Sequence, residues 1–128
     1  MERVLVVEDQ EEIASLLKFK LKSSGYDVIL AENGKIALEM AQVTPPDLMI
    51  LDIMMPVMDG VETMKILKSD EKLKSIPVIM LTAQNTEASV VTGFELGADD
   101  YITKPFRTQE FIARVKAVLA RHKKETAA

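Results

Sequence analysis

The feature that most constrains the fold of this chain is the regular alternation of short apolar runs with longer amphipathic segments. Such alternation indicates parallel strands joined by crossover helices, here in five βα units. Most of the short runs are continuously apolar, as expected for strands covered by helices on both faces of a sheet. The sequence therefore predicts an α/β protein. The predicted strands are Val4 to Val7, Asp27 to Ala31, Leu48 to Leu51, Val78 to Thr82 and Tyr101 to Thr103.

The amphipathic segments differ in how strongly they predict helices. Glu11 to Ser24 carries an apolar stripe at helical spacing and is followed by Gly25, which is typical of a helix end. Thr108 to about Lys123 shows a similar stripe, with cations near its end, where the helix dipole favours them. Thr86 to Leu96 is the weakest expected helix, because it contains Gly93 and β-branched residues of low helix propensity.

Composition limits the number of domains and the class of function. A chain of 128 residues suits one domain, expected at residues 1–124 with a short polar tail at 125–128. A formal net charge of -4 argues against direct binding of nucleic acid, and the absence of cysteine excludes disulfides and thiolate metal sites. The first apolar run ends at Glu8, too short for a signal peptide or a membrane span. We therefore expect a cytoplasmic protein.

Polar residues follow directly on the apolar runs, at the carboxyl ends of the predicted strands. Ligands of open parallel α/β sheets bind at this edge, so we expect these side chains to share one cleft. Three carboxylates there would repel one another by about 4 kcal/mol per pair at ~4 Å and an effective dielectric of 20. The residues are Glu8 and Asp9 after the first strand, Asp52 after the third, Thr82 at the end of the fourth and Lys104 after the fifth.

A divalent cation is expected to hold these carboxylates together, with Lys104 supplying a further positive charge. Mg²⁺ suits an all-oxygen site of one or two carboxylates, water and phosphate, and Mn²⁺ is an acceptable substitute. A carboxylate beside a metal ion, a lysine and a hydroxyl meets the requirements for nucleophilic attack on phosphorus. Asp52 is the expected nucleophile because it lies centrally in the sheet, whereas Glu8 and Asp9 are better placed to bind the metal.

At this point the sequence resembles the receiver domains of two-component response regulators, over essentially the whole chain. The resemblance implies a doubly wound (βα)5, flavodoxin-like fold with a parallel sheet of strand order 2-1-3-4-5. The ending from Phe106 to Arg121 is similar to receivers that precede winged-helix DNA-binding domains. The motifs that carry the resemblance are Glu8-Asp9, the segment from Asp52 to Gly60, Thr82-Ala83, and the segment from Ala98 to Phe106.

The resemblance also implies a role for each motif residue. Asp52 is the phosphoacceptor, and Lys104, Thr82 and Ala83 contact the phosphoryl group. The metal ligands are Glu8, Asp9, Asp52 and the backbone carbonyl of Met54. Thr82 and Tyr101 form a switch pair, in which the hydroxyl moves toward the phosphoryl group and the ring turns inward. The peptide bond between Lys104 and Pro105 is expected to be cis.

The implied partners are a sensor histidine kinase or phosphotransfer protein and a downstream effector or output domain. A phosphorylation-dependent homodimer through the fourth helix, fifth strand and fifth helix is also expected, a region that contains Asp99, Asp100 and Arg114. The chain is expected to be either a natural single-domain regulator or a piece of a longer transcription factor. Met54 and Gln84 are expected to influence the lifetime of the phosphate.

Two other function classes share features with a receiver domain. Haloacid-dehalogenase-like phosphatases also use an aspartyl nucleophile, but they place a second Asp two residues later, where this chain has Met54. A flavodoxin-like cofactor binder should carry a Ser/Thr/Gly-rich phosphate loop after the first strand. This chain is acidic there, from Glu8 to Glu12, which would repel a phosphate.

Overall fold

The continuously apolar runs form the strands of one parallel sheet in the computed structural model, which describes residues 1–53, 55, 57–82 and 95–127. The five strands lie in the order β2-β1-β3-β4-β5, which confirms the predicted order. All five predicted strands are present, and three of them are one residue longer than expected. The strands are β1 (Arg3–Val7), β2 (Asp27–Ala31), β3 (Leu48–Asp52), β4 (Val78–Thr82) and β5 (Asp100–Thr103).

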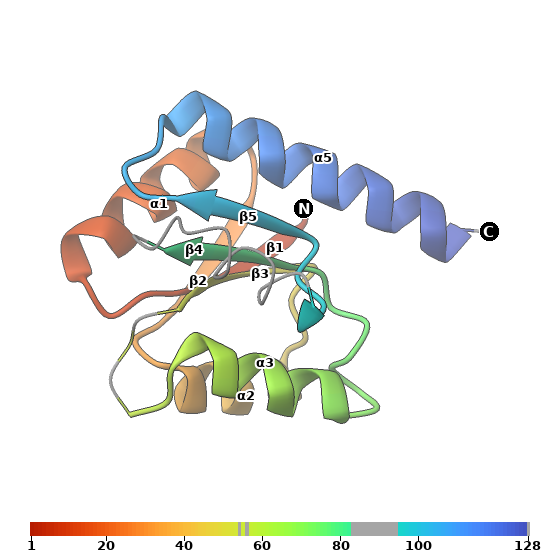
Figure 1. Cartoon of the computed structure of the whole chain (residues 1–128). Helices are drawn as coiled ribbons and strands as arrows, with labels where there is room; N and C mark the ends of the chain where they lie inside the picture. The colour runs from red at the N-terminus through yellow and green to blue at the C-terminus, as the bar shows by residue number, and fades with distance from the viewer. Residues whose placement is uncertain (54, 56, 83–94, 128) are drawn as a thin grey trace.

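Helices cover both faces of this sheet (Figure 1). Helices α1 (Glu11–Ser23) and α5 (Thr108–Ala127) pack on one face, and α2 (Gly34–Val43) and α3 (Gly60–Ser69) pack on the other. Helix α5 continues to Ala127, about one turn beyond the predicted end near Lys123. Most of the weak helix expected at Thr86 to Leu96 lies outside the described residues.

The alternation of side chains along each strand divides the core into two layers. In β1, Leu5 and Val7 join the cluster beneath α2 and α3, whereas Val4 and Val6 join the cluster beneath α1 and α5. All five residues of β3 are buried. The central position of this strand explains why its sequence lacks the polar alternation of a half-exposed strand.

The side chains of Asn33 and Asp59, each followed by a glycine, cap the helices α2 and α3. The Asn33 side-chain oxygen accepts a hydrogen bond of 2.9 Å from the backbone N–H of Ile36 at the start of α2. Asp59 does the same for Glu62 at the start of α3, at 2.8 Å. Each cap satisfies a backbone donor that has no partner within the helix, and so fixes where the helix begins.

The parallel register brings the carboxyl ends of the strands to one edge of the sheet. Val7 of β1 is paired with Leu51 of β3, and Thr82 of β4 is paired with Thr103 of β5. The carboxyl ends of these strands therefore lie side by side, which is the arrangement needed for a shared site. Within the described part of the chain, no helix combines the length and the apolar character required to span a bilayer.

Candidate functional site

Side chains at the carboxyl end of β3 and directly after β1 and β5 meet at one edge of the sheet. The Lys104 Nζ lies 2.9 Å from Oδ2 of Asp52 and 3.0 Å from Oε1 of Glu8. One carboxylate oxygen from each of Glu8, Asp9 and Asp52 lies within 4.8 Å of the others. Four of the residues predicted from strand ends alone are thus brought together by the fold.

Burial makes this cluster unusual. Glu8 and Asp52 are each only 3% exposed, and the Lys104 side chain is 18% exposed. Charged side chains are rarely buried this deeply unless they are paired, because desolvation of an isolated charge costs several kcal/mol. The ammonium of Lys104 therefore offsets part of the cost of burying the two carboxylates, and Asp9 remains exposed at the rim.

The surroundings of Glu8 favour its protonated form in the absence of a metal ion. The pKa of the Glu8 carboxyl is raised to about 7, chiefly by burial and also by its hydrogen bond with Asp52. The hydrogen bonds from Lys104 and from the backbone N–H of Gln10 act in the opposite direction. Desolvation outweighs these two contacts, which favour the ionised form. The positive charge near Glu8 is therefore too small to keep its carboxylate ionised as readily as in water.

For Lys104, hydrogen bonds to the two carboxylates outweigh the effect of burial on its pKa. Burial by itself would lower the pKa of the Lys104 ammonium, but the hydrogen bonds to Asp52 and Glu8 raise it above its ordinary value. The lysine is therefore fully charged at neutral pH. It is a fixed cation beside the carboxylate of Asp52.

The donor atoms of the cluster fit a hard divalent cation. When all three carboxylates are ionised, they exceed the single ammonium by two negative charges. The ligands are oxygen atoms only, with no His or Cys in the group, which suits Mg²⁺ better than zinc or copper. The charge and chemistry of the residues present thus match the metal that the sequence predicts.

Gly60 holds the main chain of Asp52, a role that the sequence analysis missed. The Gly60 N–H donates to the carbonyl of Ile53 at 2.9 Å and so closes the loop between β3 and α3. A Cβ atom at Gly60 would lie 2.7 Å from the carbonyl oxygen of Asp52 and 2.7 Å from Cα of Ile53. Only glycine fits this approach. The sequence signal for this role is the position of Gly60 at the end of the motif that begins at Asp52.

The structure describes some of the other predicted site residues and leaves others out. Thr82 is the last residue of β4, at the same edge as Asp52, but its side chain lies outside the described part of the structure. Met54, Ala83 and Gln84 lie outside the described residues altogether. Tyr101 is 7% exposed and packs in the core cluster beneath α2 and α3. The peptide bond between Lys104 and Pro105 is cis.

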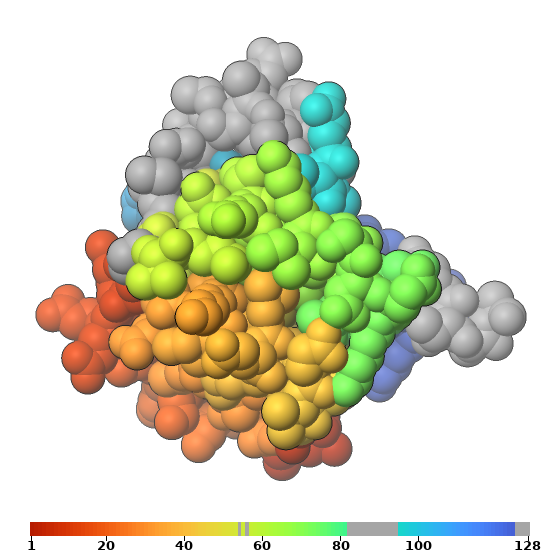
Figure 2. All heavy atoms as spheres, turned by 90° about the horizontal axis from the view of Figure 1, so that it is seen from below, coloured from red at the N-terminus to blue at the C-terminus, as the bar shows by residue number. Residues whose placement is uncertain are grey.

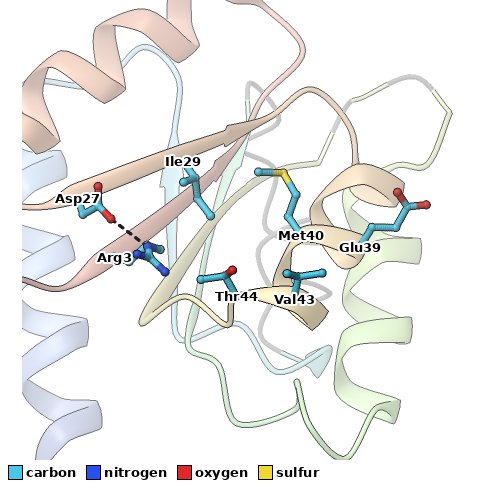
Figure 3. A pocket seen from close by; sticks show the side chains of 7 residues that line it. All are labelled: Arg3, Asp27, Ile29, Glu39, Met40, Val43 and Thr44. Atoms are coloured by element: carbon cyan, nitrogen blue, oxygen red, sulfur yellow. Dashed lines mark hydrogen bonds and ion pairs between the residues drawn. The ribbon is translucent and has the colours of Figure 1, made fainter.

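Two pockets help to locate the reactive edge of the molecule. A pocket of about 460 Å³ opens beside the acidic cluster, where Glu8 and Asp9 face Leu30 and Glu32. A second pocket, of about 540 Å³, lies between β2 and α2 (Figure 3). It is bordered by Arg3 and Asp27, which begin β1 and β2. That pocket is at the opposite edge of the sheet and takes no part in the cluster.

Comparison with known proteins agrees with this geometry. Residues 4–116 match the response regulator receiver domain family. The chain belongs to this family. A receiver domain of this kind is neither a haloacid-dehalogenase-like phosphatase nor a flavodoxin, so both alternatives are set aside.

Three relatives show how the receiver domain compares with characterised proteins. It is 50% identical over 119 residues to the alkaline phosphatase synthesis transcriptional regulatory protein PhoP of Bacillus subtilis, covering 93% of this chain and 49% of PhoP. The receiver domain of the Francisella response regulator 1452 is 36% identical, with a TM-score of 0.89 and coverage of 94% and 98%. The Mn²⁺-bound form of response regulator Rcp1 is 28% identical, with a TM-score of 0.79 and coverage of 92% and 91%. The chain thus spans about half the length of PhoP.

Proposed function

We propose that this receiver domain is a signalling switch that stores a phosphoryl group on Asp52. The observation that carries the proposal is the contact between the buried Asp52 carboxylate and the Lys104 ammonium, 2.9 Å away, with Glu8 and Asp9 alongside. A carboxylate in such a site can act as a nucleophile toward phosphorus, because nearby positive charge stabilises the negative charge of the phosphoryl oxygens in the transition state.

The reaction transfers one phosphoryl group. A carboxylate oxygen of Asp52 attacks the phosphorus of the donor, and an acyl phosphate bond forms. The bond from phosphorus to the leaving group breaks, and its electron pair stays with the leaving group, which is the imidazole of a phosphohistidine or the acetate of acetyl phosphate. The imidazole then takes a proton from solvent, whereas acetate leaves as the anion.

The residues of this chain bind the metal ion, orient the phosphoryl group and compensate the negative charge of its oxygens. Glu8, Asp9, Asp52 and the backbone carbonyl of Met54 would hold a Mg²⁺ ion, and Mn²⁺ is a suitable replacement because Rcp1 has been solved with that ion bound. The bound ion supplies positive charge that compensates the phosphoryl oxygens. Lys104 donates hydrogen bonds to one of these oxygens, and Thr82 and Ala83 contact the others.

The domain also assists the loss of its own phosphate. Water attacks the phosphorus, the bond to the Asp52 oxygen breaks, and inorganic phosphate leaves while the carboxylate is restored. The same cations that stabilise the first transfer stabilise this one, since both place charge on the same phosphoryl oxygens. Residues at positions 54 and 84 control the access of water.

Phosphorylation changes the conformation of the segment from β4 to α5. Thr82 and Lys104 sense the phosphoryl group, and the hydroxyl of Thr82 moves toward it while the ring of Tyr101 occupies its inward position. The buried ring in the structure is compatible with this inward state. About 5.5 kcal/mol is needed to reverse such an equilibrium, and two charge-assisted hydrogen bonds contribute roughly 1.5–3 kcal/mol each.

The partners follow from this role. A sensor histidine kinase or a phosphotransfer protein supplies the phosphoryl group in the cytoplasm, and an effector or output domain receives the signal. The phosphorylated form pairs with a second copy through its α5 and β5 face. Arg114 now bonds to Asp100 at 3.0 Å within the chain, and this bond is available for exchange between two copies. The receiver domain, assigned to residues 1–124 with a tail at 125–128, does not bind nucleic acid itself.

Intact mass spectrometry tests the phosphoacceptor directly. The protein is incubated with acetyl phosphate and Mg²⁺, beside the Asp52→Asn variant and a sample containing a chelator. The proposal expects one labile phosphate adduct on the parent protein and none on the variant or in the chelated sample. A parent protein that gains no phosphate from acetyl phosphate or phosphoramidate, or an adduct that persists in Asp52→Asn, would overturn it.

A further inference from the structure

Thr63 is a buried polar residue that the proposed mechanism does not use. It lies in the first turn of α3 and is 0% exposed. Its hydroxyl donates a hydrogen bond of 2.7 Å to the carbonyl of Asp59, and its backbone N–H donates to the same oxygen at 3.0 Å. Two donors from one residue thus hold the carbonyl that ends the loop after Asp52.

Gly34 of α2 holds this hydroxyl in place from the other side. Helices α2 and α3 lie side by side on one face of the molecule (Figure 2). A Cβ atom at Gly34 would lie 1.9 Å from Oγ1 of Thr63 and 3.2 Å from the carbonyl oxygen of Met58. The two helices therefore meet where the buried Thr63 hydroxyl lies between Gly34 and the Asp59 carbonyl, in the space that a side chain at position 34 would fill.

The contact continues from α3 to the phosphoacceptor. Gly60 follows Asp59, and its Cα faces the main chain of Asp52 so closely that an added Cβ would lie 2.7 Å from the Asp52 carbonyl oxygen. A shift in the first turn of α3 must therefore move the main chain of Asp52. Packed contacts of this kind transmit displacement because the interior has little free volume to absorb it.

We propose that Thr63 is a positioning residue for the site: its hydroxyl, confined by Gly34, fixes the start of α3 and, through Gly60, the main chain at Asp52. Affinity for Mg²⁺ and the rate of phosphorylation both depend on it. The inference rests on the proposed function, to which it adds residues that touch neither the metal ion nor the phosphoryl group. A purely structural role would instead alter stability and leave metal affinity unchanged.

A double-mutant cycle tests the contact between the two helices. Gly34→Ala forces the Thr63 hydroxyl away from the Asp59 carbonyl and lowers the affinity for Mg²⁺ by about 10-fold, a typical effect of residues that support metal ligands. Thr63→Ala removes the hydroxyl and weakens binding by a smaller factor. In the double variant the clash with the hydroxyl is gone and only the milder approaches to Cβ of residue 63, at 3.1 Å, and to the Met58 carbonyl oxygen, at 3.2 Å, remain. Its affinity for Mg²⁺ should therefore rise above that of Gly34→Ala and approach that of Thr63→Ala. Such rescue is the sign of direct coupling.

A matched control separates positioning from loss of stability. Gly25 has a φ of 94°, so Gly25→Ala strains the backbone, yet a Cβ there meets no atom within 4 Å. The residue precedes β2, at the edge of the sheet opposite the site. Gly25→Ala should therefore lower the unfolding temperature and leave Mg²⁺ affinity within about 2-fold of the parent, since uncoupled distant sites behave independently.

A second pair of variants tests whether the Thr63 hydroxyl positions the metal site, even if Gly34→Ala does not fold. Thr63→Val preserves the shape of the side chain and removes the donor, whereas Thr63→Ser keeps the donor and removes a methyl group. Calorimetric titration with Mg²⁺ and the rate of phosphorylation by acetyl phosphate are measured for both. The proposal expects weaker binding and slower reaction for Thr63→Val, with Thr63→Ser close to the parent.

Two results would overturn the proposal. One is equal Mg²⁺ affinity for Thr63→Val, Thr63→Ser and the parent protein. The other is an additive cycle, in which the double variant binds Mg²⁺ more weakly than Gly34→Ala does. If the parent itself gains no phosphate, the proposed function fails, and the Mg²⁺ titrations still decide whether Thr63 positions the metal site.

Discussion

The ammonium of Lys104 contacts the carboxylate of Asp52 at 2.9 Å, although the two residues are 52 positions apart in the sequence. The same ammonium also reaches Glu8, at 3.0 Å. One lysine thus serves two buried carboxylates, and Asp9 adds a third carboxylate at the rim. The cluster has an excess of negative charge that weakens the fold without a metal ion and favours binding of a divalent cation.

Replacement of Asp9 by Asn should stabilise the metal-free protein and weaken its response to Mg²⁺. The substitution removes one repelling charge, which is worth about 1 kcal/mol for unit charges ~4 Å apart in water. It also removes a predicted metal ligand, so the rise in unfolding temperature on addition of Mg²⁺ should shrink. Thermal unfolding with and without Mg²⁺ measures both effects.

Glu11→Gln is the matched control for this prediction. Glu11 is an exposed carboxylate in the first turn of α1, outside the group whose oxygens lie within 4.8 Å of one another. Its replacement should leave the Mg²⁺ response unchanged. Equal Mg²⁺ responses of the Asp9→Asn and parent proteins would show that Asp9 is not part of the metal site.

The pKa of Glu8, raised by burial to about 7, predicts how metal-free stability depends on pH. The folded protein holds a proton on Glu8 up to a higher pH than the unfolded chain does, since the ordinary pKa is 4.5. The stabilising contribution of this proton is therefore complete below about pH 4.5 and is lost as the pH rises through 7. The loss is about 3 kcal/mol, at 1.36 kcal/mol for each pKa unit.

Urea unfolding across this pH range, compared between the parent and Glu8→Gln, isolates that contribution. Glu8→Gln cannot titrate, so the difference in unfolding free energy between the two proteins should vary between pH 4.5 and 7 and be constant above that range. Saturating Mg²⁺ should make this difference in unfolding free energy depend less on pH, because the metal ion takes the place of the proton on Glu8. A pH-independent difference would mean that Glu8 is not shifted in the folded protein.

Much of the fold followed from the sequence because its strands are buried on both faces. The apolar run from Leu48 to Leu51 has no polar residue, and only a central parallel strand accounts for that. The predicted strand order was confirmed. The bounds of α5 were less accurate, because the apolar stripe fades after Leu119 while the helix continues to Ala127 through charged residues of good helix propensity.

The chemistry of the site was easier to predict than its support. Glu8, Asp52 and Lys104 could be identified because each follows an apolar run directly. The approach of Gly60 to Asp52 could not, because a glycine after an aspartate signals only a turn or a helix start. The burial of Thr63 against Gly34 depends on how two helices pack, and helical spacing within one helix does not reveal its neighbour.

Replacement of Gly60 by Ala should disturb the phosphoacceptor more than a distant glycine replacement does. The added methyl carbon would lie 2.7 Å from the Asp52 carbonyl oxygen, and backbone atoms cannot move aside cheaply. We expect the phosphorylation rate to fall by about 10-fold or more, as for other changes that displace a reacting group. Gly25→Ala is the control. Similar rates in both variants, when measured well below their unfolding temperatures, would exclude this role of Gly60.

Val57 is strained, and its replacement by Asn should stabilise the protein. It has a φ of 69°, a left-handed conformation that is a genuine outlier for a β-branched residue, and its side chain is 77% exposed. Relief of this strain is worth about 1 kcal/mol. Asn tolerates the conformation without the additional chain entropy that glycine would bring to the unfolded state.

Val43→Asn is the matched control, because Val43 is 83% exposed in a helical conformation and has no such strain to lose. Urea unfolding should show a gain for Val57→Asn and none for Val43→Asn, whereas a loss at both positions would mean that Val57 makes a favourable contact that outweighs its strained backbone.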